Sequence, residues 1–534
     1  MIFKRKMTVK IRSKARACVL LAVILAAGMI FPGSGAAASV PEGLYTLVDV
    51  GAYDRFTNNV DGYSLLVDKG MQVDMSVSSV RAVLENEHKR IEIYKQDVSR
   101  VGRAAYINYS NRFLANTADH FLEYNGNQTL GGRSVMVTAW SREKLSRVAN
   151  DKNHYVCLEI PHGSYNYTVF IKATQPLTEL GGYAYLAQNF SVFAPRAAAY
   201  TRQTQAPDPA SRGWTAETRE LYQRYFVEDA PMVWGLFDES AKWLDYAQIE
   251  SYERFFRYTF PFILVYTDLE TWQPNVKQIL DAAHARGKTV MLTLQTVDTE
   301  DGKNMVYNVL NGRHDEFLRY YANTIALAGH PVLFRLGNEM NGDWCPYSSY
   351  HTSKDTEIFN AFYRYVYEIF RQEGATRNVI WVWNPNGGSF PDFKWNDELM
   401  YYPGDAYVDV VGMTAYNTGT YYSNVGERWE TFNELYDDLY ARYDALYGQP
   451  LMITEFASAS MGGDKVAWVN NMFGEIKRFD RIKIAIWWNG RDYDADGNVT
   501  RSYVLDESPE LMEVFRRHLS QWGAPFGTDD LFGH

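Results

Sequence analysis

The sequence predicts an α/β protein in two parts, a β-rich N-terminal domain followed by a (β/α)8 TIM barrel. Residues 39–194 alternate apolar and polar side chains with the period of two that antiparallel strands have. Residues 214–521 alternate short apolar strands with amphipathic helices, which is typical of a parallel sheet built from β-α units. Between them, residues 195–213 contain three prolines and no apolar periodicity, which indicates a linker.

Residues 1–38 carry seven Lys/Arg and no acidic residue, and continue into "CVLLAVILAAGMIF" and a run of small residues. This order predicts a secretory signal peptide that is cleaved after Ala38. The alternative is an uncleaved membrane anchor, but an apolar run of 14 residues is short for a bilayer. We therefore expect a secreted, extracellular protein with no membrane attachment after cleavage.

The formal net charge of −11 becomes more negative once the basic signal peptide is removed. An acidic surface disfavours nucleic acid as a partner. Only Cys157 and Cys345 remain after cleavage, which leaves a single disulfide possible but gives no disulfide framework. We expect a monomer, and residues 522–534 are assigned to a C-terminal tail.

The N-terminal strands are separated by Gly, Asn and Pro turns, and a sandwich is predicted. The predicted strands are 71–77, 90–96, 133–140, 154–160 and 165–173. The domain has two possible roles, packing against the barrel or binding polysaccharide.

The C-terminal part contains eight predicted strands, which fit a closed barrel. They are 232–240, 260–269, 288–297, 330–341, 378–387, 408–417, 450–458 and 482–489. Helical patterns at 276–287, 357–374 and 429–448 fill the gaps. An open doubly wound sheet is disfavoured because no Gly-rich phosphate turn follows the first strand.

Active sites of such barrels lie at the C-terminal ends of the strands, and two glutamates directly follow apolar strands there. Glu339 ends the fourth predicted strand and Glu455 ends the seventh. Two carboxyl groups across a barrel mouth are the equipment for cleaving a glycosidic bond, one protonated and one ionised. Arg335 and Tyr416 are placed to hold Glu455 ionised.

Aromatic residues at the strand ends supply flat apolar faces for sugar rings, although tryptophans there are as often part of the core. The predicted platforms are Trp344, Trp383, Trp487 and Trp488. Asn338, next to Glu339, is predicted to contact a sugar hydroxyl.

Residues 230–520 resemble glycoside hydrolase family 26, whose best-known members are secreted β-mannanases. The matching stretches are "FRLGNEMNGDW", "NVIWVWNPN", "YYPGDAYVDVVGMTAYN" and "PLMITEFA". The resemblance implies that Glu339 is the acid/base and Glu455 the nucleophile, with Tyr416 beside the nucleophile. We expect no cofactor and no metal.

Two positions depart from the family pattern. Asn338 stands where the mannanases usually have histidine, and Thr414 stands where they often have aspartate. Both departures concern residues near the sugar at the cleavage point. They bear on mannan specificity and leave the catalytic glutamates in place.

The segment "DYDADGNVT", residues 492–500, is spaced like the start of a calcium loop. Tyr503 stands where an EF-hand needs a glutamate, so a hairpin turn is favoured. The function predicted from the sequence is a secreted, retaining O-glycosyl hydrolase whose partner is a β-linked polysaccharide, endo-1,4-β-mannan first. The alternatives are another β-glycan or exopolysaccharide, or a glycan-binding protein without catalysis.

Overall fold

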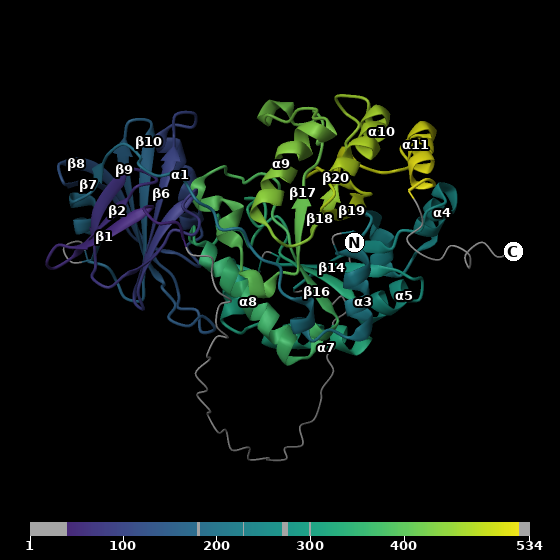
Figure 1. Ribbon diagram of the computed structural model, residues 1–534, viewed down its shortest axis with the longest axis horizontal. Coiled ribbons are helices and arrows are strands. Elements are labelled where there is room, and N and C mark those ends of the chain that lie inside the picture. Colours follow the sequence, from purple (N-terminus) through teal and green to yellow (C-terminus); the bar gives the residue numbers. More distant parts are fainter. Residues whose placement is uncertain are drawn as a thin grey trace, which may run out of the picture. The chain divides into compact units, whose positions relative to one another are not determined.

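The computed structural model describes residues 40–178, 182–227, 229–269, 276–297, 299 and 301–522 (Figure 1). The predicted signal peptide and residues 523–534 of the predicted tail lie outside this set. In Figure 1 the purple and blue strands belong to the N-terminal domain, and teal, green and yellow elements form the barrel. Among the described residues, no helix combines the length and apolarity needed to cross a membrane.

The N-terminal domain consists of two antiparallel sheets, as predicted. One sheet has the order β1-β2-β3-β11 and the other β4-β5-β6-β10-β9-β8-β7. The strands are β1 Tyr45–Asp49, β2 Asp54–Asn58, β3 Tyr63–Val67, β4 Gln72–Asp74, β5 Arg81–Glu85, β6 Lys89–Asp97, β7 Phe121–Leu130, β8 Arg133–Ser141, β9 His154–His162, β10 Tyr165–Ala173 and β11 Ser191–Val192. Two helices accompany them, α1 Arg103–Ser110 and α2 Ala184–Gln188.

The central strands β9 and β10 of the seven-stranded sheet are buried on both faces. In β9, Val156 and Leu158 pack into the core between the two sheets. Their neighbours Tyr155 and Cys157 point the other way and join the core that continues into the barrel. Because alternate residues of a strand point to opposite faces, this double burial explains why "HYVCLEI" reads as a nearly continuous apolar run.

The C-terminal part is a closed barrel of eight strands in the order β12 to β19, which confirms the predicted fold. The strands are β12 Val233–Phe237, β13 Phe262–Asp268, β14 Thr289–Gln295, β15 Val332–Leu336, β16 Val379–Trp383, β17 Val410–Thr414, β18 Leu451–Phe456 and β19 Ile482–Trp488. The helices are α3 Ala216–Tyr225, α4 Ala247–Phe256, α5 Val276–His284, α6 Met305–Leu310, α7 Asp315–Ala328, α8 Thr356–Gln372, α9 Phe432–Leu446, α10 Lys465–Glu475 and α11 Pro509–Leu519. A hairpin of β20 Arg491–Tyr493 and β21 Val499–Ser502 follows the last barrel strand.

Strand alternation divides the barrel residues into an inner and an outer set. Leu333 of β15 packs inside the barrel with Met291 and Ile380, whereas Phe334 packs outside against the helices. Arg335 is two residues beyond Leu333 and therefore also points inward, where it is fully buried. The Arg335 guanidinium therefore lies inside the barrel, just below the C-terminal ends of the strands.

Residues 195–213, the predicted linker, contact both parts of the protein. The backbone N–H of Tyr200 donates to Ser78 Oγ of the N-terminal domain. Further along, the N–H of Thr204 donates to the carbonyl of Leu446, and Arg212 Nε lies 2.6 Å from Asp409 Oδ1 of the barrel. The segment is irregular in structure, apart from one short 3₁₀ turn, and its polar groups are bonded to its neighbours.

Candidate active site

A cavity of about 1060 Å³ opens at the C-terminal ends of the barrel strands. It is lined by six residues that the sequence singles out, namely Asn338, Glu339, Trp344, Tyr416, Glu455 and Trp488. A cavity of this size exceeds what one monosaccharide needs and suits a segment of a chain.

Glu339 lies three residues beyond β15 and adopts a left-handed backbone conformation. Its φ is +55°, and that of Gly337 is +57°. The left-handed region is unfavourable for a residue with a side chain, so the surroundings must hold it there. The Glu339 N–H donates to the Asn384 carbonyl, and the Glu339 carbonyl accepts from the Gly342 N–H, each at 2.8 Å. These bonds turn the chain so that the Glu339 side chain enters the cavity.

Glu455 reaches the same cavity through an irregularity in β18. Met452 packs inside the barrel, yet Phe456, four residues later, packs outside against the helices. In a regular strand these two residues would share a face. The pairing of β18 with β19 shifts between Ile453 and Phe456, and this bulge turns Glu455 inward.

Glu455 is held by one positive charge and one hydroxyl. Arg335 Nη1 lies 2.5 Å from Glu455 Oε1, and the Tyr416 hydroxyl donates to Glu455 Oε2 at 2.9 Å. Arg335 is itself fixed, because its Nε donates to Thr293 Oγ1 and its Nη1 to Asn384 Oδ1. These contacts fix the position of the Glu455 carboxyl group in the cavity.

Glu339 has the opposite surroundings, since no cation among the described residues forms an ion pair with it. Burial and then the negative charge of Glu455 raise the pKa of Glu339 to about 8. The Trp344 indole N–H, 3.3 Å from Glu339 Oε2, acts in the lowering direction but does not outweigh them. At neutral pH one carboxyl group is therefore protonated beside one that is paired with arginine.

Asn338 lines the cavity next to Glu339, and its amide orientation is fixed. Its Oδ1 accepts hydrogen bonds from Gln295 Nε2 at 2.8 Å and from the Tyr347 hydroxyl at 3.3 Å. Its Nδ2 makes no hydrogen bond within the described part of the chain. Asn338 therefore offers the cavity a donor. Thr414, the second departure from the family pattern, lies in a buried network with Asn384 and Thr454.

The predicted tryptophans fall into two groups. Trp344 is 51% exposed at the cavity edge beside Phe390, which is equally exposed, and Trp488 stacks on Phe237 at 5.1 Å. Trp383 and Trp487 do not line the cavity, so their prediction as substrate-binding residues is wrong. Both point outward from the barrel wall and are fully buried in the core beneath the helices. Trp487 and Trp488 are adjacent in one strand, so only one of them can face the cavity.

The sequence model of "Glycosyl hydrolase family 26" matches residues 279–441, the stretch that runs from α5 through Glu339 to α9. This part of the barrel therefore matches glycosyl hydrolase family 26. This confirms the resemblance given by the strand-end motifs.

Two curated relatives match parts of the chain. Endoglucanase H of Acetivibrio thermocellus is 29% identical over 244 residues, which cover 45% of this chain and 25% of the relative. A mannan endo-1,4-beta-mannosidase of Bacillus subtilis is 28% identical over 162 residues, covering 30% of this chain and 37% of the relative. The matches thus span well under half the length of either relative. A solved modular endo-beta-1,4-mannanase of Cellulomonas fimi is 18% identical, with a TM-score of 0.44, over 59% of this chain and 76% of that one.

Several residues that line the family 26 cavity were missed by the sequence analysis. Tyr266 of β13 lies near both members of the ion pair, and the Arg335 guanidinium is 5.4 Å from its ring centre. Strand alternation could have indicated Tyr266, because it lies two residues before Asp268, the last residue of the strand, and so faces the same side. Phe390 also lines the cavity. Phe390 belongs to a loop with no periodicity, so no local pattern indicates it.

The segment 492–500 forms a hairpin, as favoured. Asp494 Oδ1 accepts from the backbone N–H groups of Asp496 and Asn498, which closes the turn. Asp492 instead pairs with Arg501 at 2.8 Å, and Arg501 also pairs with Glu427 of the loop after β17. The hairpin is thereby tied to the opposite loop and forms one wall of the cavity.

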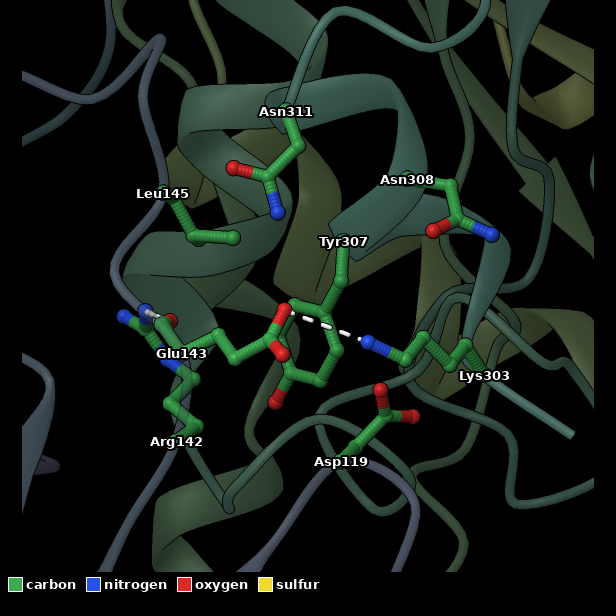
Figure 2. Close-up of a pocket in the computed structure, with 8 residues that line it drawn as sticks. All are labelled: Asp119, Arg142, Glu143, Leu145, Lys303, Tyr307, Asn308 and Asn311. Atoms are coloured by element: carbon green, nitrogen blue, oxygen red, sulfur yellow. Dashed lines mark hydrogen bonds and ion pairs between the residues drawn. The ribbon is translucent and has the colours of Figure 1, made fainter.

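A second, much smaller pocket lies where the N-terminal domain meets the barrel (Figure 2). Its volume is about 10 Å³, room for a single water molecule. Figure 2 shows Glu143 and Lys303, 3.2 Å apart, bridging its two sides. The pocket is too small for a sugar and belongs to the interface between the two parts.

The N-terminal domain also contacts the loop that follows Glu339. The Tyr109 hydroxyl of α1 donates to Asp343 Oδ2, and the Tyr109 ring lies 5.2 Å from that of Tyr350. Asp343 directly precedes Trp344, the residue that donates to Glu339. The domain thus packs against the segment that carries the environment of the acid/base candidate.

Proposed function

We propose that this protein is a retaining glycoside hydrolase acting on a β-linked polysaccharide. The observation that carries the proposal is the pairing of two carboxyl groups in one cavity, where the pKa of Glu339 is raised and Glu455 is in contact with Arg335. A glycan-binding protein without catalysis has no need for this division of protonation states.

In the first step the Glu455 carboxylate attacks the anomeric carbon, and the bond to the leaving sugar breaks. Glu339 donates its proton to the leaving oxygen. This step leaves a glycosyl ester on Glu455 and Glu339 as a carboxylate. In the second step Glu339 takes a proton from water, the water oxygen attacks the anomeric carbon, and Glu455 is released. Two inversions give net retention.

The Tyr416 hydroxyl and Arg335 contribute by orienting Glu455. Both contact the carboxylate that must reach the anomeric carbon. Trp344, Phe390 and Trp488 supply apolar surfaces around the two glutamates on which sugar rings can stack.

The first substrate we propose is β-1,4-mannan, because the Bacillus subtilis relative is named a mannan endo-1,4-beta-mannosidase. A gluco-configured β-glycan is the second candidate, favoured by two observations. Asn338 presents an amide donor next to Glu339 where the mannanases usually have histidine. Endoglucanase H also matches a larger share of this chain than the mannosidase does.

We also propose that the protein is secreted, on the basis of the basic and apolar order of residues 1–38. Sequencing the N-terminus of the protein recovered from culture medium tests this. Cleavage after Ala38 supports the proposal, and protein found only inside cells contradicts it.

The substrate is tested by measuring products on a panel of β-mannan, glucomannan, mixed-linkage β-glucan and β-1,3-xylan. Activity on at least one of these, with the anomeric configuration retained in the first product seen by NMR, is expected. Inversion would contradict the nucleophile role of Glu455. Asn338→His should change the ratio of rates on manno- and gluco-configured substrates, because a site that bonds a hydroxyl discriminates against its displacement. An unchanged ratio would remove Asn338 from substrate selection.

A further inference from the structure

Three metal-ligating side chains meet at the end of the barrel opposite the cavity. They are Glu217 in the first turn of α3, His284 at the end of α5, and His330, two residues before β15. Because His330 precedes the strand whose far end leads to Glu339, this cluster lies at the N-terminal end of the barrel. The glycosidase mechanism makes no use of it.

The geometry of the cluster is close to that of a coordination site. One ligand atom from each residue lies within 4.8 Å of the other two. The His284 and His330 rings are stacked, with centroids 3.8 Å apart and planes 13° apart, so their nitrogens lie along neighbouring edges. His284 Nδ1 is 3.5 Å from Glu217 Oε1. A tetrahedral zinc ion with bonds of about 2.0–2.2 Å needs ligand atoms roughly 3.3 Å apart, so binding requires the two stacked rings to turn until their nitrogens converge on the ion.

A fourth residue supports the arrangement. His330 Nε2 lies 3.2 Å from Asp281 Oδ1, and Asp281 is in turn paired with Lys277. Carboxylates hydrogen-bonded to a ligating histidine are a regular part of zinc sites, where they orient the ring. The cluster is also reachable from solvent, since the side chains of Glu217 and His284 are about half exposed.

We propose that Glu217, His284 and His330 form a binding site for a divalent transition metal of the zinc class. Two imidazoles and one carboxylate suit zinc, cobalt, nickel or copper and do not suit calcium or magnesium, which prefer oxygen. From the sequence we expected no metal. It could not find this site, because the three residues are far apart in the chain and form no short motif.

The role we assign to the metal is to fasten α3 to the barrel wall. Helix α3 and the residues around it place Trp214, Tyr222 and Tyr225 in the core inside the barrel, and the Trp214 indole N–H donates to the Val379 carbonyl at the start of β16. The helix therefore closes the N-terminal end of the barrel. A metal bound to Glu217, His284 and His330 would join it to α5 and to the turn before β15, and so stabilise the folded chain.

The test is a titration of tag-free protein, residues 39–534, with Co²⁺ after treatment with a chelator. Visible absorption reports cobalt bound by histidine, and calorimetry gives the stoichiometry. We expect one ion per chain, a melting temperature that rises with added Zn²⁺, and unchanged glycosidase activity. His284→Ala, His330→Ala and Glu217→Gln should each weaken binding by about tenfold or more, and Asp281→Asn should weaken it less.

His88→Ala is the matched control, since His88 is an exposed histidine far from the cluster in the chain. It should bind cobalt like the wild type. The proposal is overturned if the wild type shows no saturable binding, or if the double variant His284→Ala/His330→Ala binds as tightly as the wild type while circular dichroism shows it folded. The role in fastening α3 has its own test. That role is overturned if the variants lose the metal but the melting temperature of the wild type does not respond to Zn²⁺.

Discussion

Two glutamates in different regions of this protein, Glu339 in the cavity and Glu92 at the interface of the two parts, have opposite pKa shifts. Burial raises the pKa of both. At Glu92 the charges of Arg81, Lys172 and Arg90 outweigh burial and hold the pKa well below its ordinary value. At Glu339 the negative charge of Glu455 raises the pKa further and outweighs the lowering effect of Arg335.

The difference teaches that burial alone does not decide the state of a carboxyl group. Glu92 lies 2.6 Å from Arg90 Nε, 2.8 Å from Lys172 Nζ and 3.0 Å from Arg81 Nη1. Every one of these charges is compensated, which suits a structural role. Glu339 has been left without a cation, which costs stability and suits a proton donor.

The largest expected effect is on turnover. Glu455→Ala should lower kcat by about 10⁴-fold or more, because the nucleophile is lost. Glu430→Gln, which neutralises another acid lining the cavity, should cost less than about tenfold. Steady-state kinetics on the best substrate of the panel measures kcat for both variants. A similar loss in both variants would mean that the cavity responds to total charge and not to the Glu455 role.

The next effect is on stability at the interface. Glu92→Ala should lower the free energy of unfolding by about 3–5 kcal/mol, because it leaves buried arginine and lysine charges uncompensated. Asp49→Ala breaks an exposed pair with Lys69 and should cost far less than Glu92→Ala, because solvent screens the two charges. Urea unfolding measures both. Equal losses would contradict the contrast between a buried network and a surface pair.

A smaller effect on stability is expected at Glu339, where replacing the glutamate should make the protein more stable at high pH. Its folded-state pKa of about 8 exceeds the ordinary value of 4.5, so the folded state holds its proton more tightly. The stability from this group is therefore present below pH 4.5 and is lost as pH rises through 8. Glu339→Gln removes this loss and should be more stable than the wild type at pH 9, by about 1–2 kcal/mol. Denaturant unfolding at pH 5 and pH 9 checks it. The raised pKa would be contradicted if the difference in free energy of unfolding between Glu339→Gln and the wild type were the same at pH 5 and pH 9.

The smallest effect concerns the contact between the N-terminal domain and the loop of Trp344. Tyr109→Phe removes the hydrogen bond to Asp343 and should loosen the Trp344 contact that lowers the pKa of Glu339. The alkaline limb of the pH–rate profile should then move upward by a few tenths of a unit, with kcat/KM reduced by about twofold. Tyr45→Phe, in β1, is the control. An identical profile in both variants would mean that the domain has no influence on the acid/base group.

The barrel and its two glutamates were predictable because the strands carry a clear apolar pattern and the motifs stand at their ends. Trp383 and Trp487 were assigned wrongly because proximity to a strand end was used without strand alternation. The inward turn of Glu455 was not predictable, since it depends on a shift in pairing between β18 and β19. The core that the N-terminal sheet shares with the barrel was also not predictable from the sequence. A strand buried on both faces has the same pattern whichever neighbour covers it.

The most direct test of the divided protonation states is a ¹³C NMR titration of the glutamate carboxyl groups, with Glu339 assigned by comparison with Glu339→Gln. We predict that Glu339 titrates near pH 8 in the wild type. In Glu455→Gln its pKa should fall, because the repelling negative charge is gone and the positive charge of Arg335 is no longer neutralised. A Glu339 that titrates near 4.5 in the wild type, or whose pKa is unchanged in Glu455→Gln, would contradict the account.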